Sequence, residues 1–332
     1  MHTVLLPEPI YPEGRKMLEG KVRIVEAPDF SAEILKPLMP EVDAIILRTR
    51  AKMTRDLIQA GGKLQVIART GAGVDNVDVD AATEKGIYVC HNPHVNTVPV
   101  AEQVLAFLLI LAKQIPLLDR EVRKENFGIR YEYLPVDLAG KVLGLLGFGK
   151  IGREVAKKAC LGLQMEVQAF DPYLSPSQIA AGGAHPVKSM TELFSSSHAV
   201  SIHVPLNEET RGLVGKSLLV RMKPDAILIN TSRGGIIDEE ALAEALRERR
   251  LAGAGIDVFA EEPPSKDNLL LNLPNVVVTP HSSALTKECA AKMATEAVRQ
   301  TLEVLSGREP EFVFNRESLK TRIQVKEAST DG

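Results

Sequence analysis

Three polar side chains suited to anion binding and proton exchange follow apolar runs in the second half of the chain: Arg233, Glu262 and His281. Arginine is always charged, and its planar fork matches a carboxylate. Histidine exchanges a proton near neutral pH, and a carboxylate bonded to its other ring nitrogen fixes which nitrogen carries the proton. Each residue alone could be a helix-start ion pair, a loop charge or a turn histidine. Together, at strand ends, they favour a site that binds a small acid and moves a proton at its oxygen.

A glycine-rich motif precedes these residues. The segment Gly147-Phe148-Gly149-Lys150-Ile151-Gly152 fits the G-x-G-x-x-G pattern, follows an apolar run and opens an expected helix. The glycines permit a tight turn, the approach of a pyrophosphate and close helix packing. Asp171 ends the next expected strand, where a carboxylate binds ribose hydroxyls and repels a 2′-phosphate. The motif predicts NAD in preference to NADP, and the alternative is a glycine-rich turn in an unrelated α/β fold. With the acid–base residues, NAD points to hydride transfer at a C–OH group.

The elements that must position these residues alternate between short β-branched runs and helical patterns, which is typical of doubly wound α/β sheets. In the first hundred residues we expect four strands, at Thr3–Leu6, Ala44–Leu47, Val66–Ala68 and Ile87–Val89. The helices expected between them are Pro12–Leu18, Ala32–Met39, Thr54–Ala60 and Asp78–Lys85. These elements predict one compact unit.

A long apolar helix, expected at Val100–Gln114, leads into a second alternating run. Its six expected strands are Lys141–Leu146, Glu166–Phe170, Ala199–His203, Ala226–Asn230, Ala254–Val258 and Val276–Thr279. Its expected helices are Ile151–Leu161, Met190–Ser195, Lys216–Met222 and Glu239–Glu248. Six strands are the number expected of a dinucleotide-binding fold. A last helix is expected at Thr286–Leu305, and the charged tail from Ser318 is expected to be disordered.

Composition narrows the class of protein. A chain of 332 residues predicts about two domains, and its net charge of −3 argues against nucleic acid or a membrane surface as partner. The longest apolar runs are about half of the roughly 20 residues that a membrane span needs, and no secretory leader is apparent. We therefore expect a soluble, cytoplasmic protein. Cys90, Cys160 and Cys289 lie far apart without a C-x-x-C motif, so we expect three reduced structural thiols and no metal site.

An ordered set of motifs over roughly residues 43–307 resembles the D-isomer-specific 2-hydroxyacid dehydrogenases, most closely the D-3-phosphoglycerate dehydrogenase branch. The motifs are Arg69-Thr70-Gly71-Ala72-Gly73-Val74-Asp75-Asn76, Val100-Ala101-Glu102, the glycine-rich motif, His203-Val204-Pro205-Leu206, Ser232-Arg233-Gly234-Gly235, Asp257-Val258-Phe259 with Glu262-Pro263, and Pro280-His281.

The resemblance implies roles for single residues. Arg233 would bind the carboxylate and 2-oxo group of the substrate, and Glu262 would pair with His281, the general acid and base. Backbone N–H groups of Gly71, Ala72 and Gly73 would hold the carboxylate, with Asn96 also at the substrate, and Asp257 would contact the nicotinamide carboxamide. Further cofactor contacts are implied at His203, Val204, Pro205, Thr210, Thr231 and Ser232.

The resemblance also implies an interleaved architecture. A flavodoxin-like substrate domain would comprise residues 1–98 and 285–332, and a Rossmann NAD-binding domain, residues 99–284, would be inserted into it. Homodimers would form through the NAD-binding domains. We expect a short form, without the C-terminal regulatory domain of many phosphoglycerate dehydrogenases.

The substrate is left more open than the chemistry. Arg48, Arg50 and Arg69 stand at or after strand ends of the first unit, where they could bind a phosphate or second carboxylate, or could form surface ion pairs. The best single expectation is 3-phosphoglycerate and 3-phosphohydroxypyruvate. The alternatives are reduction of glyoxylate, hydroxypyruvate or another 2-oxo acid and, more distantly, an NAD-sensing binding protein of the corepressor type.

Overall fold

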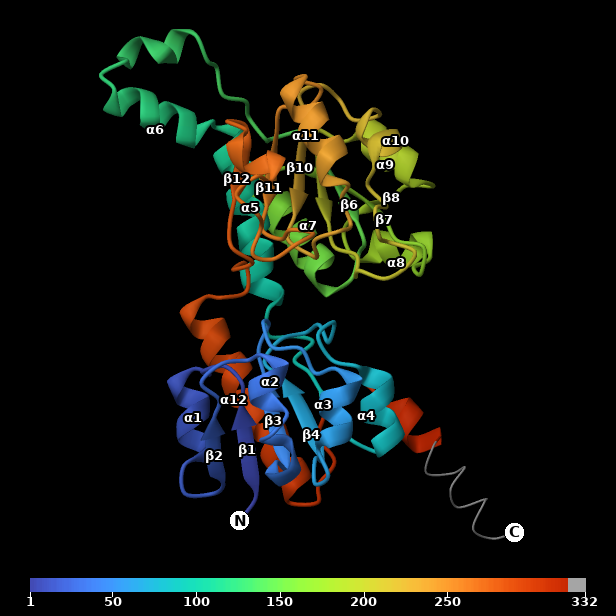
Figure 1. The fold of residues 1–332 in the computed structure, drawn as a ribbon. Coiled ribbons are helices and arrows are strands. Elements are labelled where there is room, and N and C mark those ends of the chain that lie inside the picture. Colours follow the sequence, from blue (N-terminus) through green and yellow to red (C-terminus); the bar gives the residue numbers. More distant parts are fainter. Residues whose placement is uncertain (322–332) are drawn as a thin grey trace. The chain divides into compact units, whose positions relative to one another are not determined.

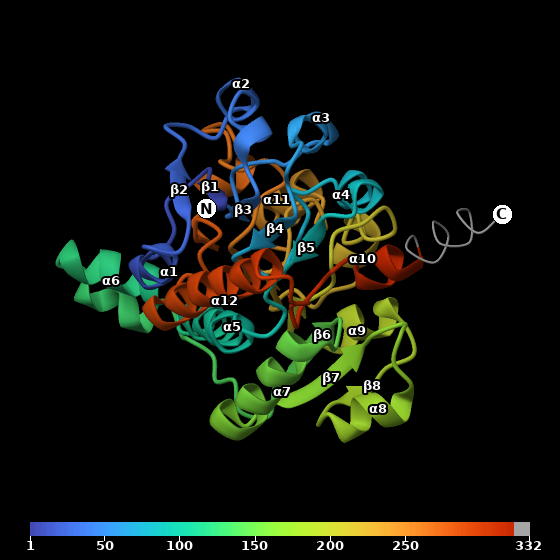
Figure 2. The ribbon, with the colours of Figure 1, turned by 90° about the horizontal axis from the view of Figure 1, so that it is seen from below.

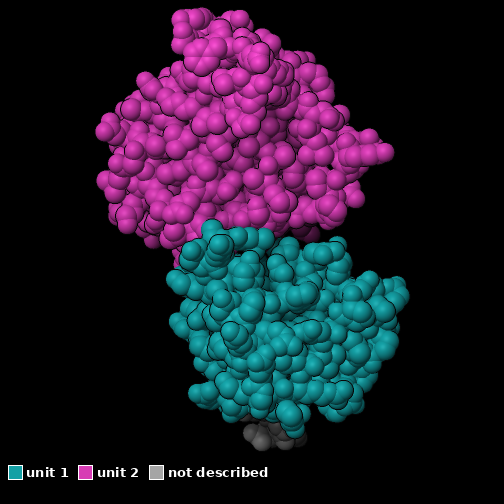
Figure 3. Space-filling model, turned by 90° about the vertical axis from the view of Figure 1, so that its left-hand side faces the viewer, with its two compact units in different colours: residues 1–96, 285–332 teal, residues 97–284 magenta. Residues whose placement is uncertain are grey.

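The computed structural model describes residues 1–321, which divide into two compact units (Figure 3). Unit 1 combines residues 1–96 with the segment from Leu285 onwards, and unit 2 comprises residues 97–284. Unit 2 is therefore inserted, in sequence, between the two parts of unit 1.

Unit 1 is built on a five-stranded parallel sheet in the order β2-β1-β3-β4-β5, the flavodoxin-like order (Figure 1). The strands are β1 (Thr3–Leu6), β2 (Arg23–Glu26), β3 (Ala44–Leu47), β4 (Val66–Arg69) and β5 (Tyr88–Cys90). The four-strand expectation missed β2. This strand lies at the sheet edge with charged, exposed ends at Arg23 and Glu26, so it lacks the continuous apolar run of its neighbours.

The helices of unit 1 cover both faces of its sheet. They are α1 (Pro12–Leu18), α2 (Ala32–Leu35), α3 (Arg55–Ala60), α4 (Val79–Lys85) and α12 (Lys287–Leu305), with a short 3-10 turn η1 (Met39–Glu41). The helix expected over Ala32–Met39 ends at Leu35, because Pro37 has no N–H to continue the helical hydrogen bonds. Helices α1 and α12 lie side by side (Figure 2), and a Cβ on Gly14 would be 2.8 Å from the Cβ of Ala294.

The chain after α12 returns to the free edge of β5. Val313 pairs antiparallel with Cys90, and the Phe314 N–H donates to the Val89 carbonyl at 2.7 Å. The buried Asn315 accepts from the Val89 N–H at 3.0 Å and donates to the Ile87 carbonyl at 3.0 Å. Residues 316–321 are helical, so the disorder expected from Ser318 is wrong for residues 318–321. The rest of that expected tail lies outside the described residues.

Unit 2 is built on a seven-stranded parallel sheet in the order β12-β11-β10-β9-β6-β7-β8. Its strands are β6 (Val142–Leu146), β7 (Glu166–Phe170), β8 (His185–Pro186), β9 (Ala199–Ile202), β10 (Ile227–Asn230), β11 (Gly253–Ile256) and β12 (Val276–Val278). Read from β8, this is the dinucleotide-binding order with one further strand. Strand β8 was not among the expected strands, because it has two exposed residues and no apolar run.

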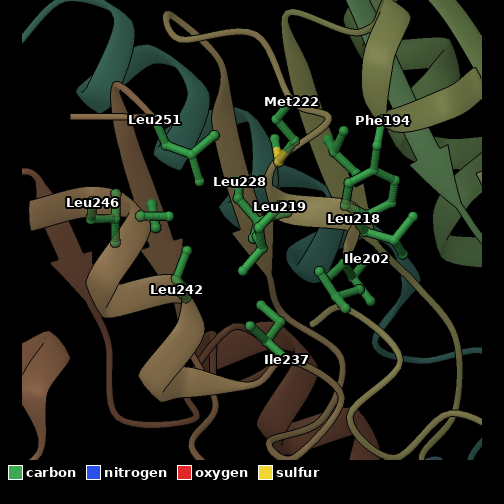
Figure 4. Packing of buried hydrophobic residues seen from close by; sticks show 14 of the residues in the cluster. Phe194, Ile202, Leu218, Leu219, Met222, Leu228, Ile237, Leu242, Leu246 and Leu251 are labelled. Atoms are coloured by element: carbon green, nitrogen blue, oxygen red, sulfur yellow. The ribbon is translucent and has the colours of Figure 1, made fainter. Parts of the chain in front are cut away.

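Helices cover both faces of this sheet as well. They are α5 (Thr97–Ala112), α7 (Lys150–Leu163), α8 (Pro176–Ala181), α9 (Met190–Ser196), α10 (Lys216–Leu219) and α11 (Glu239–Arg247), with the 3-10 turn η3 (Leu269–Asn272). On one face, Phe194, Leu219, Leu228 and Leu242 belong to a single buried apolar cluster (Figure 4). The two doubly wound parallel sheets expected from the sequence are confirmed.

Residues 115–136, which include helix α6 (Ile115–Arg123) and the 3-10 turn η2 (Phe127–Tyr131), project from the rest of unit 2 as an arm (Figure 1). Gln114, with φ of 54°, separates α5 from α6. Among the described residues no single helix has the length and apolar composition of a membrane span, and α5 and α6, bent by 54°, reach them only when taken together. The large exposed apolar side chains of the arm are Ile115, Val122, Phe127, Tyr131, Tyr133, Leu134 and Val136.

The three cysteines are free thiols, and Cys90 and Cys289 are buried. Burial raises the pKa of the Cys90 thiol to about 12 and also raises the pKa of Cys160 and Cys289. A raised pKa leaves little thiolate at neutral pH, so these thiols are poor nucleophiles.

Candidate active site

The loops after β11 and β12 bring Glu262 and His281 into contact. The Nδ1 atom of His281 is 2.7 Å from Oε2 of Glu262, and the Phe259 N–H donates to Oε1 of the same carboxylate at 3.1 Å. The two side chains are 33% and 32% exposed, so a small molecule can reach the pair. Because both loops leave the carboxyl ends of parallel strands, the pair lies at the edge where open α/β sheets bind ligands.

The Glu262 carboxylate is held in its ionised form. Partial burial acts to raise its pKa, but the hydrogen bond and charge of His281, the Phe259 N–H and the charge of Arg233 outweigh burial and lower it below its usual range. An ionised carboxylate can only accept hydrogen bonds. The Nδ1 atom of His281 therefore carries the proton in this contact, and Nε2 is left for other partners.

Asp257, at the end of β11, holds the loop that carries His281. Its carboxylate is 1% exposed and accepts from the Ser282 N–H at 2.9 Å, the Ser283 N–H at 3.0 Å and the hydroxyls of Ser283 and Thr279. The Asp257 carbonyl accepts from the His281 N–H at 2.7 Å. These contacts keep the His281 backbone at a φ of 50°. Residues other than glycine rarely adopt this conformation, and it recurs at active sites.

The loop that carries Arg233 is organised by Asn230, the last residue of β10. Asn230 is 1% exposed; its Oδ1 accepts from the Ser232 N–H at 3.0 Å and its Nδ2 donates to the Arg233 carbonyl at 2.8 Å. Gly234 lets this loop approach the one that carries Glu262, since a Cβ there would overlap the Phe259 carbonyl at 1.7 Å. The Nη1 atom of Arg233 donates to the Ser232 carbonyl at 2.7 Å.

The glycine-rich motif forms the turn between β6 and α7. Gly147 has a φ of 90°, and a Cβ on it would lie 2.8 Å from the His203 carbonyl. Gly152 has no room either, because its Cβ would be 2.6 Å from the Gly147 carbonyl. A Cβ on Gly149 would meet nothing within 4 Å, and Gly149 gives α7 no side-chain cap. The N-terminus of α7, the end of a helix that favours a phosphate, directly follows this turn.

Asp171, the residue after β7, contacts this turn. Its Oδ2 accepts from the Phe148 N–H at 2.8 Å and its Oδ1 from the Tyr173 N–H at 3.0 Å. Each oxygen keeps a further lone pair for another donor. The carboxylate therefore lies against the glycine-rich turn, where it could accept hydrogen bonds from the ribose of a bound dinucleotide.

Two buried polar atoms in unit 2 fit a ligand along the same sheet edge. Nε2 of His203 and Oγ1 of Thr231 have no hydrogen-bond partner within residues 1–321. Burial lowers the pKa of His203 to about 4, so its ring is neutral near pH 7. Buried polar atoms normally have hydrogen-bond partners, so these two atoms and the open space at Gly149 fit the binding of a dinucleotide.

The other predicted cofactor residues shape the loops. Val204 lies against Gly147, and a Cβ on that glycine would be 3.0 Å from its Cγ1. The Thr210 hydroxyl donates to the Pro205 carbonyl at 2.6 Å, and the Ser232 hydroxyl to Oδ1 of Asn230 at 2.8 Å. The contact of Asp257 with the cofactor, which the resemblance implies, stays a prediction, because its carboxylate is occupied by the His281 loop.

Within unit 1, Arg69, the last residue of β4, contacts Arg48, the residue after β3. Arg69 is 6% exposed; it donates to the carbonyls of Gly73 at 2.9 Å and Leu47 at 3.1 Å, and to that of Arg48. Arg48 is half-buried and donates to the Pro9 carbonyl at 2.9 Å. Arg50 lies over the Phe30 ring, 4.3 Å from its centroid. Asn96, the last residue of this part of unit 1, is half-buried.

Sequence reasoning missed the residues that hold the site loops from within. Besides Asn230, these include Thr279, Ser282, Ser283 and Glu239, whose Oε1 accepts from the Ala260 N–H at 2.6 Å. The available signal was a polar residue at the end of a buried strand, which Asn230 shares with Asp257. Glu239 gave no signal, because a glutamate in the first turn of a helix has an ordinary place there.

Comparison with known proteins gives this site a family. Residues 105–283 match the model for "D-isomer specific 2-hydroxyacid dehydrogenase, NAD binding domain". The D-3-phosphoglycerate dehydrogenase of Methanocaldococcus jannaschii is 38% identical over 315 residues, which are 95% of this chain and 60% of that protein. The chain thus spans about three fifths of the length of the curated relatives that it matches first.

Solved structures agree with this match over nearly their whole length. The TT0316 protein of Thermus thermophilus is similar with a TM-score of 0.84 and 34% identity, over 94% of this chain and 99% of that one. A glyoxylate reductase from Paecilomyes thermophila gives a TM-score of 0.85 and 29% identity, over 95% and 99% of the two chains. The chain belongs to the D-isomer specific 2-hydroxyacid dehydrogenase family, and the residues that match the family's NAD-binding domain lie in unit 2.

Proposed function

We propose that this protein is an NAD-dependent D-2-hydroxyacid dehydrogenase. The observation that carries the proposal is the contact between His281 Nδ1 and Glu262 Oε2, 2.7 Å long, at the strand edge that also presents Arg233. A histidine that is oriented by an ionised carboxylate is the usual device for moving a proton at a carbonyl or hydroxyl oxygen. NAD, when bound, supplies the hydride acceptor, and reduced NAD supplies the hydride.

The contact determines which nitrogen of His281 exchanges a proton with the substrate. Because the Nδ1–H of His281 donates a hydrogen bond to Glu262, the proton exchanged with the substrate is the one at Nε2. For oxidation of a hydroxyl, neutral Nε2 accepts its proton; for reduction of a 2-oxo group, protonated Nε2 donates one to the oxygen. The positive charge that His281 gains is stabilised by Glu262, which stays ionised because its pKa is lowered.

Two sets of fixed donors are candidates for binding the substrate. In unit 2, Arg233 would pair with the carboxylate and the 2-oxo group, since its planar fork can serve two acceptors at once. In unit 1, the turn Gly71-Ala72-Gly73 would bind a carboxylate through backbone N–H groups, and Asn96 would contribute a side-chain amide. We assign substrate binding to unit 1 on this ground.

The best candidate substrates are 3-phosphoglycerate and 3-phosphohydroxypyruvate. The curated relatives that carry the phosphoglycerate dehydrogenase name support this choice, as does the presence of Arg48, Arg50 and Arg69 at one sheet edge of unit 1. Arg48 is the best probe, because Arg69 is already bound to three carbonyls and its loss would disturb the loop itself. Arg48→Ala should raise KM for 3-phosphohydroxypyruvate about tenfold or more, and KM for glyoxylate much less.

Reduction of glyoxylate or hydroxypyruvate is the second candidate. The likeness to a solved glyoxylate reductase, at 29% identity over 95% of this chain, favours it. The same acid–base pair and the same arginine would serve either acid, so the two candidates differ only in what binds the third carbon and its substituent.

An NADH-linked assay separates these candidates. The purified chain is offered 3-phosphohydroxypyruvate, hydroxypyruvate, glyoxylate and pyruvate, and kcat/KM is compared for each. We expect the phosphorylated acid to be preferred and His281→Ala to abolish turnover. No turnover with any of a broad set of 2-oxo acids, with NADH binding retained, would favour the NAD-sensing binding protein.

We further propose that the protein forms a homodimer through unit 2. The arm, residues 115–136, carries exposed Phe127, Tyr131 and Leu134, at 63%, 75% and 80%, and apolar clusters of this kind mark interfaces. A second copy would bury this surface in an isologous contact. The cytoplasmic location expected from the sequence stays a prediction, which cell fractionation tests.

A further inference from the structure

We propose that His91 positions the turn Gly71-Ala72-Gly73 for binding the substrate carboxylate. The inference rests on the proposed function, which assigns that turn to the carboxylate. It concerns only unit 1, in which every contact used below lies.

Three consecutive carbonyls of the turn are tied down by three different donors. The Asn92 N–H donates to the Gly71 carbonyl at 2.9 Å, Nδ1 of His91 is 2.8 Å from the Ala72 carbonyl, and Nε of Arg69 donates to the Gly73 carbonyl at 2.9 Å. A carbonyl can only accept, so Nδ1 of His91 is the donor in the second contact. Of the three donors, only the histidine ring can be altered without changing the main chain or a buried charge.

Fixing the carbonyls fixes the N–H groups. In a trans peptide the N–H points opposite to the carbonyl of the same plane. The contact with His91 therefore turns the Gly73 N–H away from His91, and the contact with Asn92 does the same for the Ala72 N–H. Within residues 1–321 no group accepts a hydrogen bond from either N–H. Successive N–H groups presented in this way form a concave site for an anion.

The His91 ring is itself held on two sides. Its edge-to-face contact with Phe314 has a centroid distance of 5.4 Å and an angle of 89°. Its backbone N–H donates to the Phe312 carbonyl at 3.2 Å, and its carbonyl accepts from Nε2 of Gln300 at 3.2 Å. The ring therefore has little freedom to rotate away from Ala72.

The support continues into α12 through a buried polar cluster. Gln300 is 0% and Asn92 is 2% exposed, and Nε2 of Gln300 donates to Oδ1 of Asn92 at 3.1 Å. Nδ2 of Asn92 donates to the Met293 carbonyl at 2.9 Å, and Oε1 of Gln300 accepts from the Phe312 N–H at 3.3 Å. Every polar atom of these two side chains has a partner, and a fully satisfied network of this kind is rigid. The position of the turn is thus fixed by α12 as well as by its own loop.

Two variants separate the hydrogen bond from the ring. His91→Phe keeps a ring against Phe314 but cannot donate to Ala72, whereas His91→Asn places an amide N–H near the position of Nδ1 and loses the ring. Loss of one neutral hydrogen bond corresponds to a roughly threefold to tenfold weaker interaction. We expect His91→Phe to raise KM for the 2-oxo acid by this factor with KM for NADH unchanged, and His91→Asn to return it to within about twofold of wild type.

A binding measurement makes the test independent of turnover. Calorimetric titration with oxamate, an unreactive 2-oxo carboxylate analogue, is carried out in the presence of saturating NADH. His91→Phe should weaken oxamate by the same factor and leave the Kd of NADH alone. Oxamate binding to His91→Phe as to wild type, no binding to wild type, or equal weakening of oxamate and NADH would overturn the inference. Oxamate binding that depends on His91 without turnover of any acid would instead overturn the proposed function alone.

Discussion

The Nδ1 atom of His281 lies 2.7 Å from Oε2 of Glu262, and the same carboxylate accepts from the Phe259 N–H at 3.1 Å through its other oxygen. One side chain thus orients the imidazole and ties the loop after β12 to the loop after β11. Because Glu262 spans two loops, the orientation of His281 depends on the packing of two neighbouring strands and not on its own loop alone.

Replacing Glu262 by glutamine should slow the reaction without weakening cofactor binding. Glutamine retains an oxygen for Nδ1–H but has no charge to stabilise the protonated imidazole. We expect kcat to fall by about 10- to 100-fold, within the range typical of acid–base catalysis, with KM for NAD unchanged. The control is Glu261→Gln, the exposed neighbour, which should behave as wild type in the same steady-state assay. A full kcat in Glu262→Gln would remove the acid–base role assigned to the pair.

Asp257→Asn should destabilise unit 2 and slow the reaction together. The carboxylate accepts from two N–H groups and two hydroxyls, and an asparagine amide would set its NH₂ group against some of these donors. We expect the free energy of unfolding to fall by about 3 kcal/mol, because hydrogen bonds to a buried charge are worth more than neutral ones.

Urea unfolding and kcat together check this prediction. Ser283→Ala, which removes one hydroxyl donor and keeps the charge, should cost about 1 kcal/mol. If Asp257→Asn lowers kcat but leaves the unfolding curve unchanged, the residue acts on the ligand rather than on the loop.

The parts of this fold that sequence could predict are those specified by neighbouring residues. Strands such as Ala44–Leu47 are buried throughout, so each is a continuous apolar run that can be recognised in the sequence. The glycine-rich turn also depends on segments close in sequence, because its three glycines and Asp171 belong to two consecutive strands and the helix between them. For the same reason Arg233, Glu262 and His281 could be selected by type and by their place after strands.

The parts that could not be predicted depend on contacts between distant segments. Val313 completes the edge of β5 by pairing with Cys90, and nothing in either sequence neighbourhood specifies the other. The role of Asp257 in holding Ser282 and Ser283 requires β11 and β12 to be adjacent. The contact of His91 with Ala72 could not be predicted either, because it joins two loops of unit 1 that sequence alone does not bring together.

Asp171→Ala should reduce the preference for NAD over NADP. The carboxylate is fixed by the N–H groups of Phe148 and Tyr173, and its charge would repel a 2′-phosphate at the ribose. We expect the ratio of kcat/KM for NADP to that for NAD to rise by about tenfold or more. Asp137→Ala removes an exposed carboxylate paired with Lys113 and should leave the ratio unchanged. Unchanged discrimination in Asp171→Ala would contradict the assignment of this residue to the ribose.

Acid should destabilise unit 2 through two neutral histidines before its carboxylates are protonated. Burial lowers the pKa of His203 to about 4, and burial with the charges of Lys223 and Lys141 lowers the pKa of His198. A histidine whose pKa is lower in the folded chain binds protons more weakly there than when unfolded. Its contribution is complete above its ordinary pKa of about 6.5 and is lost as the pH falls through the folded value.

The window for this loss lies between pH 6.5 and about 4. Within it His203 alone should lower the free energy of unfolding by up to about 1.4 kcal/mol per pH unit. Urea unfolding at pH 7 and pH 5 measures the effect. Nδ1 of His198 accepts from the Val142 N–H at 3.0 Å, and His198→Asn keeps an acceptor there without a titrating ring. The difference between the two pH values should therefore be smaller in His198→Asn, and an equal difference would show that His198 does not contribute.

Leu134→Glu should dissociate the proposed dimer. Leu134 is 80% exposed on the arm of unit 2, near exposed Phe127 and Tyr131 in sequence, and a charge in a buried apolar interface costs several kcal/mol. Leu161→Glu is the matched control, because Leu161 is 77% exposed at the end of α7, outside the arm. Sedimentation velocity should give a dimer for wild type and Leu161→Glu and a monomer for Leu134→Glu at the same concentration. A wild-type monomer, or a Leu134→Glu dimer as stable as wild type, would contradict the use of the arm as the interface.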